Sequence, residues 1–305
     1  MRSTERIEVT DLVLDIGPDG VRRPVDAGAV IQACLDHGDR RAARIARSLP
    51  TTDGVLDPDR VDHLLVAVHG EIQRLAEEFH HGARVWAIVG PMLDALRAAG
   101  VPPPYRVVDV GCGTGYVVRW LAANARAPDV SFAGVDLNPA LIAAARGAAL
   151  EEHLDCDFHA SDVFALDLPA TVLISTGVLH HFRSAALERF FRLHEEGTAQ
   201  GFVHIDFEPS PIAGLGAWLF HHTRMRLPLS RHDGVRSAQR AYPAELLVEV
   251  TATQAPSFAT WVSDRTVRGT PFPCALTNLV GTRRSLGPDA MTAVGHRPRH
   301  GRGRR

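Results

Sequence analysis

Three glycines stand at alternate positions directly after a short apolar run: Gly111, Gly113 and Gly115. The stretch "VVDVGCGTGYVVRWLA" (residues 107–122) holds them between a predicted strand over 105–110 and a predicted helix over 116–123. Glycine adopts backbone conformations closed to other residues and lets a ligand approach the main chain. A glycine turn between a parallel strand and a helix is where doubly wound folds bind nucleotides. The stretch therefore predicts a nucleotide-type site; the alternative is a tight connection that binds nothing.

The spacing of the glycines separates two classes of nucleotide. A dinucleotide-binding turn reads G-x-G-x-x-G, whereas this turn reads G-x-G-x-G, and Tyr116 stands where the third glycine would be. Asp109 lies just before the turn. Its carboxylate would repel a pyrophosphate but suits an amine. The pattern therefore disfavours a nicotinamide-dependent dehydrogenase.

Further candidate residues follow the next predicted strands. "SFAGVDLNP" ends in Asp136, 21 residues after Gly115, where an acid can accept hydrogen bonds from ribose hydroxyls. "DFHASDVFALDLP" contains Asp162, and "TVLISTGVLHHF" carries His180 and His181 after a fourth strand. "GFVHIDFEPS" reads as a fifth strand.

Taken in this order, the motifs resemble those of class I S-adenosylmethionine (SAM) methyltransferases, over roughly residues 101–286. The resemblance implies an α/β fold, a Rossmann-like seven-stranded αβα sandwich, with SAM as the cofactor. It further implies that Asp136 binds both ribose hydroxyls and that Leu137 lies against the adenine. In the same way, Asp162 would bind the adenine amino group, and the backbone amide of Val163 would reach the edge of the ring. The glycine turn and Asp109 complete the implied cofactor site.

The histidine pair supplies the candidate catalytic residues, His180 and His181. A Gly-Val-Leu-His-His stretch is common after the fourth strand in small-molecule members of the family, such as the quinone-biosynthesis methyltransferases. Imidazole is partly neutral near physiological pH and can take a phenol or enol proton. The alternative is that the rings only line the pocket or pack against Phe182. Asp206 and Glu208, near the end of the fifth strand, either reach the substrate or are solvated or salt-bridged, and no metal site is predicted.

The rest of the chain predicts an organisation in three parts. Residues 1–100 read as a mostly helical N-terminal cap, with one helix from Asp26 to about Ser48, a second starting at Asp57-Pro58 and a third over about 83–99. Residues 101–286 form the methyltransferase domain, in which 209–239 are predicted to be a lid over the substrate. An amphipathic segment that touches a membrane is the alternative for that insertion. Residues 287–305 are expected to be a disordered basic tail.

Composition limits the partners. The chain has 305 residues, 45% of them hydrophobic, which is enough for a full core, and no apolar run is long enough for a membrane span. The start lacks the apolar stretch of a signal peptide, and four widely spaced cysteines fit no disulfide framework, so a cytoplasmic location is expected. Outside the arginine-rich end the chain is net acidic, which makes a nucleic-acid partner unlikely. The sequence does not indicate an oligomeric state.

These observations predict a SAM-dependent methyltransferase that modifies oxygen or carbon, and less readily nitrogen, of a small-molecule acceptor. An aromatic, quinone-like or natural-product acceptor is favoured. The alternatives are an RNA methyltransferase, suggested by the arginine-rich end, and a non-catalytic SAM-binding protein.

Overall fold

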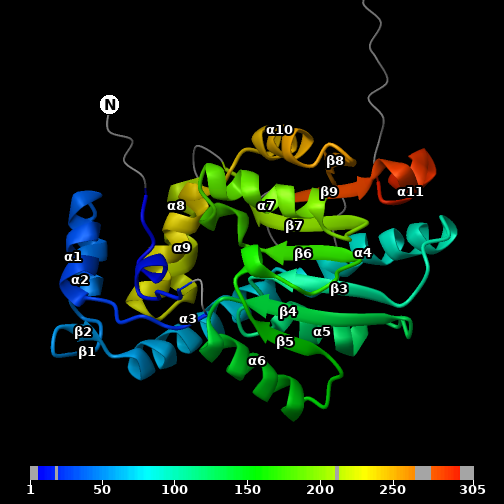
Figure 1. Cartoon of the computed structure of the whole chain (residues 1–305). Helices are drawn as coiled ribbons and strands as arrows, with labels where there is room; N and C mark the ends of the chain where they lie inside the picture. Colours follow the sequence, from blue (N-terminus) through cyan, green and yellow to red (C-terminus); the bar gives the residue numbers. More distant parts are fainter. Residues whose placement is uncertain (1–5, 18–19, 210–212, 265–275, 296–305) are drawn as a thin grey trace, which may run out of the picture.

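A computed structural model describes residues 6–17, 20–209, 213–264 and 276–295. Its centre is a seven-stranded sheet with the strand order β5-β4-β3-β6-β7-β9-β8 (Figure 1). Strand β9 pairs antiparallel with both of its neighbours, and the other pairs in the sheet are parallel. The strands are β3 (Tyr105–Val110), β4 (Val130–Asp136), β5 (Asp157–Ala160), β6 (Val172–Thr176), β7 (Gly201–Phe207), β8 (Phe258–Val262) and β9 (Leu276–Arg283). This arrangement confirms the predicted Rossmann-like seven-stranded sheet.

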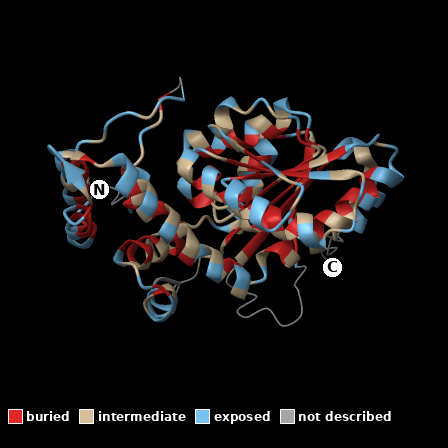
Figure 2. Cartoon of the chain, turned by 90° about the horizontal axis from the view of Figure 1, so that it is seen from below, coloured by how far each residue is buried: buried red, intermediate tan, exposed pale blue. Residues whose placement is uncertain are grey.

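Helices cover both faces of the sheet, because neighbouring residues of each buried strand point to opposite sides. In β7, Val203 and Ile205 join a core shared with α4 (His81–Ala98), α5 (Tyr116–Asn124) and α6 (Pro139–Glu151). Phe202 of the same strand joins the opposite core, shared with α7 (Ala185–Glu196) and α10 (Ala244–Gln254). Figure 2 shows the result: buried strands lie between helices that are buried on one face only.

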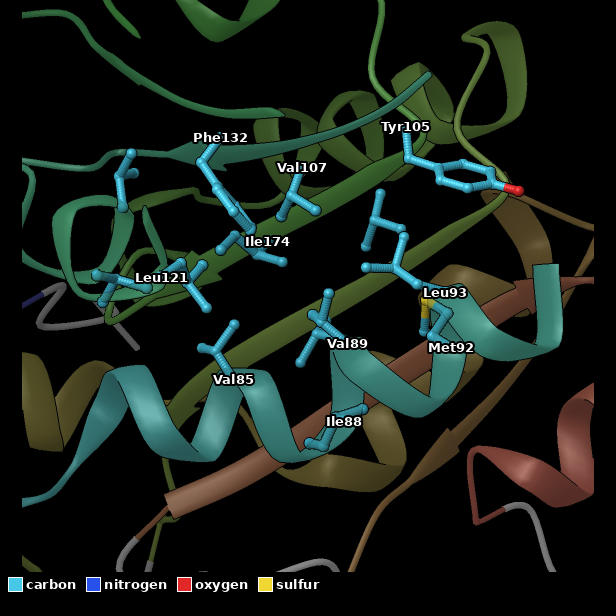
Figure 3. Close-up of a cluster of buried hydrophobic side chains, with 14 of the residues drawn as sticks. Val85, Ile88, Val89, Met92, Leu93, Tyr105, Val107, Leu121, Phe132 and Ile174 are labelled. Atoms are coloured by element: carbon cyan, nitrogen blue, oxygen red, sulfur yellow. The ribbon is translucent and has the colours of Figure 1, made fainter. Parts of the chain in front are cut away.

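Helix α4 carries the largest share of the first core. The apolar face of this helix is buried, and Leu96 belongs to it. Figure 3 shows five of its side chains packed beneath the sheet: Val85, Ile88, Val89, Met92 and Leu93. The buried area of one such side chain corresponds to roughly 1.5–3 kcal/mol. Because this helix packs on the sheet, it is part of the sheet's core rather than of a separate cap.

The chain before α4 forms a smaller helical group with its own core. It contains the 3-10 helix η1 (Thr10–Leu12), α1 (Ala27–Asp36), α2 (Arg40–Ala46), the strands β1 (Thr51–Thr52) and β2 (Val55–Leu56), and α3 (Pro58–Glu78). Its core runs from Ile7 to Val68 and includes Leu229 from a distant part of the chain. In Figure 1 this group lies toward the arrowheads of the parallel strands, the edge at which the glycine turn is found.

One helix boundary in this group was predicted wrongly. The expected single helix from Asp26 to about Ser48 is two helices, because Gly38 takes a left-handed conformation with φ +73°. Asp39 then starts α2 by accepting a hydrogen bond from the backbone N–H of Ala42 at 2.9 Å. The second predicted helix start is confirmed, since Asp57 caps α3 and Pro58 is its first residue.

The insertion after β7 forms two helices, α8 (Ala213–Arg224) and α9 (Pro228–Arg240). Helix α9 packs against α2 and α3 through Leu229, so the insertion is continuous with the N-terminal helical group. Leu215, Trp218 and Leu219 of α8 are instead exposed. Residues 210–212 of the predicted lid lie outside the described residues.

The expected disordered tail is wrong for its first part. Residues after β9 continue as η5 (Arg284–Leu286) and α11 (Gly287–Ala293), which packs on α4. Val294 is fully buried in the core of the sheet. Two apolar residues attach this segment to the core of the sheet: Met291 packs against the core, and Val294, three positions later, is buried in it. Residues 296–305 lie outside the described residues. Within the described ranges, no helix combines the length and the apolar character that crossing a membrane requires.

Candidate active site

The glycine turn after β3 is built so that side chains are excluded from it. All three glycines have left-handed backbones, with φ values of +69°, +55° and +76° at Gly111, Gly113 and Gly115. A Cβ atom on Gly111 would lie 2.6 Å from Val178, and one on Gly115 would lie 2.4 Å from the ring of Phe158. Only glycine avoids both the backbone strain and these contacts. The turn therefore presents bare backbone at the carboxyl edge of the sheet.

Asp109 lies beneath this turn with an unsatisfied carboxylate. The residue is 1% exposed, and its Oδ1 atom has no hydrogen-bond partner among the residues that the structure describes. Burial, and then the nearby charge of Asp136, raises the pKa of Asp109 well above its usual value. A buried carboxylate without a partner is costly, so this atom fits a site that a cationic or hydrogen-donating ligand completes.

Asp136 closes the turn from the neighbouring strand, as predicted from its position at the end of β4. Its Oδ2 atom accepts a hydrogen bond from the backbone N–H of Gly113 at 2.9 Å, and its Oδ1 atom accepts one from Asn138 at 2.9 Å. These bonds fix the carboxylate while leaving lone pairs on both oxygens for a ligand. Leu137 beside it is 40% exposed, an apolar surface next to a polar group.

Asp162 and Val163 lie next along the same edge. The backbone N–H of Ser161 donates to the carbonyl of Asp136 at 3.0 Å, which brings the end of β5 against the end of β4. Asp162 starts the 3-10 helix η2 (Val163–Ala165) and accepts a hydrogen bond from Phe164 N–H at 2.9 Å. The structure thus brings the predicted cofactor residues to one edge of the sheet. Their contacts with a ligand stay predictions.

Helix α3 covers the glycine turn, which the sequence motifs did not indicate. A Cβ atom on Gly113 would lie 2.7 Å from the ring of His69, and Gln73 accepts a hydrogen bond from Arg119 of α5 at 3.0 Å. Burial lowers the pKa of His69. Neither His69 nor Gln73 is part of a sequence motif, because both lie inside a long amphipathic helix. Their polar character on the side of α3 that contacts the turn is the one sequence feature that could have indicated them.

His180 is oriented by an acid on the next strand. It lies in the 3-10 helix η3 (Leu179–His181) after β6, and its Nδ1 atom is 2.8 Å from Oδ1 of Asp206 in β7. The backbone N–H of His180 also donates to Asp206 Oδ2 at 3.0 Å. Burial would raise the pKa of Asp206, but the His180 ring and backbone N–H bonds hold it below its usual value. The ionised carboxylate favours the proton on Nδ1, so Nε2 of His180 presents a lone pair.

That lone pair is buried, and no atom of the described part of the chain forms a hydrogen bond with it. The nearest acid is Glu8, which comes from the N-terminal segment and is 2% exposed; its Oε1 atom lies 3.9 Å from His180 Nε2. Burial is the main reason why the pKa of Glu8 is raised. A free imidazole nitrogen in this position can accept a proton or bind a cation.

His181 belongs to the same group. Its Nδ1 atom is 2.8 Å from Asp11 Oδ1, and its Nε2 atom is 3.9 Å from Glu8 Oε2. Burial would lower the pKa of His181, but the charges of Glu8 and Asp11 raise it to about 9. Arg240 of α9 joins Glu8 at 2.9 Å and Asp11 at 2.5 Å. Thus the N-terminal segment, η3, β7 and α9 meet at the histidine pair.

Sequence reasoning missed Glu8, Asp11 and Arg240 at this group, since they lie more than 50 residues from the histidines in both directions and in no motif. The sequence left open whether Glu208 reaches the substrate or is solvated or salt-bridged. In the structure, Thr277 of β9 donates a hydrogen bond to Glu208, whose pKa is raised by burial and by Glu245.

The comparisons with known proteins agree with this geometry. Residues 107–197 match the family model described as a methyltransferase domain. An uncharacterised protein of Mycobacterium tuberculosis, Rv1405c, is 30% identical over 151 residues, which cover 48% of this chain and 53% of the relative. The chain spans about half the length of the curated relatives it matches.

Two solved methyltransferase structures are similar to this chain to different degrees. The plantazolicin methyltransferase BpumL, in complex with S-adenosylhomocysteine (SAH), superimposes with a TM-score of 0.52 at 9% identity, over 74% of this chain and 91% of that one. The magnesium protoporphyrin IX methyltransferase of Synechocystis, with bound SAH, gives a TM-score of 0.43 at 18% identity, over 85% and 99%.

Residues 107–197 therefore match a methyltransferase domain, and they lie in a seven-stranded Rossmann-like sheet that carries the glycine turn.

Proposed function

We propose that this protein transfers a methyl group from SAM to oxygen or carbon of a small-molecule acceptor. The observation that carries the proposal is the orphan carboxylate of Asp109 beneath a turn of three left-handed glycines, with the fixed carboxylate of Asp136 beside it. A pyrophosphate would be repelled by this pair of acids, whereas SAM carries an amine and ribose hydroxyls that can satisfy them.

We assign each part of the cofactor to one group of residues at this edge of the sheet. Asp109 faces the position of a cation, and Asp136 offers lone pairs to two hydroxyl groups. Leu137 supplies an apolar surface for the adenine, and Asp162 and the Val163 amide supply polar groups at its edge. When bound, SAM supplies a methyl group on a positively charged sulfur.

We assign the acceptor side to His180 and His181. They lie after β6, beyond the switch point of the sheet from the glycine turn, at the carboxyl edge where ligands of doubly wound folds bind. Asp206 orients one ring and Asp11 the other, so the pair favours the acceptor in its deprotonated form and holds it for in-line attack. Alignment of this kind contributes roughly 7–11 kcal/mol, more than proton transfer alone.

The contacts over the site are consistent with a small-molecule acceptor. Glu8 and Asp11 lie against the histidines, and His69 of α3 lies against the glycine turn. The relative BpumL is named for a natural product, plantazolicin. The net acidic charge of the chain outside its arginine-rich end also disfavours RNA.

Calorimetry with SAH tests the proposal. The wild-type chain should bind one SAH, and Asp136→Ala should weaken binding at least about tenfold, since hydrogen bonds to a charged group contribute ~1.5–3 kcal/mol each. Asp162→Ala should weaken it less, because it removes one bond at a more open edge. The matched control is Asp94→Ala on α4, whose side chain is 77% exposed. Binding of NADH without binding of SAH would overturn the proposal.

A further inference from the structure

We propose that Glu8, His180 and His181 bind one divalent transition-metal ion on the acceptor side of the site. One ligand atom from each residue lies within 4.8 Å of the others. Two imidazole nitrogens and one carboxylate oxygen form the donor set of His₂Glu zinc sites and of 2-His-1-carboxylate iron sites. A nitrogen-rich set of this kind disfavours Mg²⁺ and Ca²⁺, which prefer oxygen ligands.

The distances leave room for an ion and exclude direct hydrogen bonds. Glu8 Oε1 is 3.9 Å from His180 Nε2, and Glu8 Oε2 is 3.9 Å from His181 Nε2. A hydrogen bond would need about 3.2 Å or less. Two metal–ligand bonds of about 2.0–2.2 Å each can bridge atoms separated by up to roughly 4.2 Å. Both rings therefore face the same carboxylate across a gap that one ion spans.

The surroundings of the two rings have the features of a metal site. Metal-binding histidines usually donate their other ring N–H to a carboxylate, which fixes the tautomer and directs the free nitrogen at the ion. Asp206 accepts such a bond from Nδ1 of His180, and Asp11 accepts one from Nδ1 of His181, each at 2.8 Å. His180 is only 2% exposed, and its Nε2 atom has no hydrogen-bond partner within the described ranges.

The charges also favour a divalent cation. Glu8, Asp11 and Asp206 bring three carboxylates to the group, and Arg240 is the cation that pairs with the first two. Three carboxylates against one arginine favour a further cation at this group, and a divalent ion would take the place of the proton that His181 otherwise carries.

Such an ion would determine which acceptors react; this step rests on the proposed function. Three protein ligands leave a position open for an oxygen of the acceptor. The ion lowers the pKa of a hydroxyl bound there, so its proton passes to solvent. The oxygen lone pair then forms the new bond to the methyl carbon as the bond from that carbon to sulfur breaks. The acceptor class is therefore a phenol or enol, methylated on oxygen.

Cobalt titration of the whole chain tests the ion site without an acceptor. The protein is treated with EDTA, and Co²⁺ is added while visible absorption is recorded, with Zn²⁺ as the competitor. One Co²⁺ per chain should bind and be displaced by Zn²⁺. Asp206→Asn should weaken Co²⁺ binding about 10–100-fold, the usual effect of removing an orienting carboxylate. His181→Asn and Glu8→Gln should weaken it further.

The control is His63→Asn, which removes an exposed histidine of α3 and should leave Co²⁺ affinity unchanged. His181 is used beside Glu8 because its side chain is 38% exposed, so its replacement is less disruptive than that of a buried acid. SAH binding is measured on every variant to show that the chain is folded. A wild-type chain that binds SAH but no stoichiometric Co²⁺, or equal Co²⁺ binding by His181→Asn and His63→Asn, would overturn the ion site alone. Failure to bind SAH would instead overturn the proposed function.

Discussion

The two halves of the site are built in different ways. On the cofactor side, one short segment supplies the shape: the backbone of Gly111, Gly113 and Gly115, with single acids from β3 and β4. On the acceptor side, side chains from the N-terminal segment, η3, β7 and α9 meet in a group of charges. The first half depends on local backbone geometry and the second on ionic contacts over long sequence distances.

The two halves should therefore be disrupted by different kinds of substitution. A backbone turn fails when a side chain is forced into it, and it is insensitive to charges elsewhere in the chain. A group of buried charges fails when one partner is removed, because the remaining charge is left without compensation. Variants in one half should therefore leave the properties of the other half largely unchanged.

The largest effect is expected from Gly115→Ala in the cofactor half. Alanine at φ +76° is strained by roughly 1–3 kcal/mol, and its Cβ would lie 2.4 Å from the Phe158 ring, which adds overpacking of ~1–3 kcal/mol. We expect SAH binding to be lost and the free energy of unfolding to fall by about 2–6 kcal/mol. Calorimetry and urea unfolding measure the two effects.

Gly100→Ala provides a matched control, because Gly100 has the same φ of +76° and nothing lies within 4 Å of its Cβ position. It carries the backbone strain without the contact with a ring. If the two variants lose equal stability, crowding at the turn is unimportant and the comparison between the halves is weakened.

The cofactor half was predictable from the sequence because its determinants are local. Gly111, Gly113 and Gly115, together with Asp136 at the end of a strand, occur at fixed spacings that reflect the turn they form. Most strands of the sheet were likewise predictable as short apolar runs, and the count of seven was implied by the resemblance. That successive side chains of β7 point to opposite faces of the sheet could also be predicted, because every β-strand has this alternation.

The acceptor half was predictable only where it touches a motif. His180 and His181 could be located because they follow β6, but Glu8 and Arg240 lie far from them in sequence and meet them only through tertiary packing. The two-helix break at Gly38 and the packing of Val294 were missed because a single glycine or valine decides each. Sequence periodicity averages over such single residues.

The next largest effect is expected from Arg240→Met in the acceptor half. Arg240 is buried between Glu8 and Asp11, so its removal leaves two acids close together. Breaking a buried pair in this way costs about 3–5 kcal/mol. Urea unfolding should show this loss, while SAH affinity in the folded protein changes less than about threefold, because no cofactor residue is touched.

Arg224→Met is the control for a lost arginine in the same insertion. Arg224 pairs with Glu78 at 2.7 Å, but both side chains are well exposed, so the pair contributes only about 0–1 kcal/mol. Equal losses for Arg224→Met and Arg240→Met would show that the acceptor half does not depend on a buried ionic group.

A smaller effect is expected from pH acting on the support of the N-terminal segment. Asp233 of α9 accepts hydrogen bonds from the backbone N–H groups of Val9 and Thr10 at 3.1 and 2.8 Å. His232 lies between Asp233 and Asp39, at 2.6 and 3.0 Å. Burial would lower the pKa of His232, but these two acids raise it. Burial would likewise raise the pKa of Asp39, yet hydrogen bonds from Ala42 and His232 lower it to about 2.

The directions of these two pKa shifts define a pH range in which the protein is most stable. The raised pKa of His232 gives a contribution that is complete below its ordinary value of 6.5 and is lost as pH rises through the higher value in the folded state. The lowered pKa of Asp39 gives a contribution that is present above 3.8 and is lost as pH falls toward about 2. Melting temperatures measured from pH 3 to 9 should therefore fall on both sides, and His232→Gln should flatten the alkaline side. His63→Gln, an exposed control, should keep the wild-type profile, and an unchanged profile for His232→Gln would contradict the assignment.

The smallest effect is expected from Trp218→Ala on α8, in the insertion predicted to be a lid. Trp218 is 45% exposed and stacks on His222, and Leu215 and Leu219 beside it are 71% and 59% exposed. Because these side chains are well exposed, surface replacement should change stability by less than about 0.5 kcal/mol and leave SAH affinity unchanged. Met225→Ala is the comparison within the insertion, since Met225 is 3% exposed and should cost ~2–5 kcal/mol. A large rise in the acceptor's KM for Trp218→Ala, at constant SAH affinity, would restore α8 as a lid and extend the acceptor half beyond the charged group around Glu8.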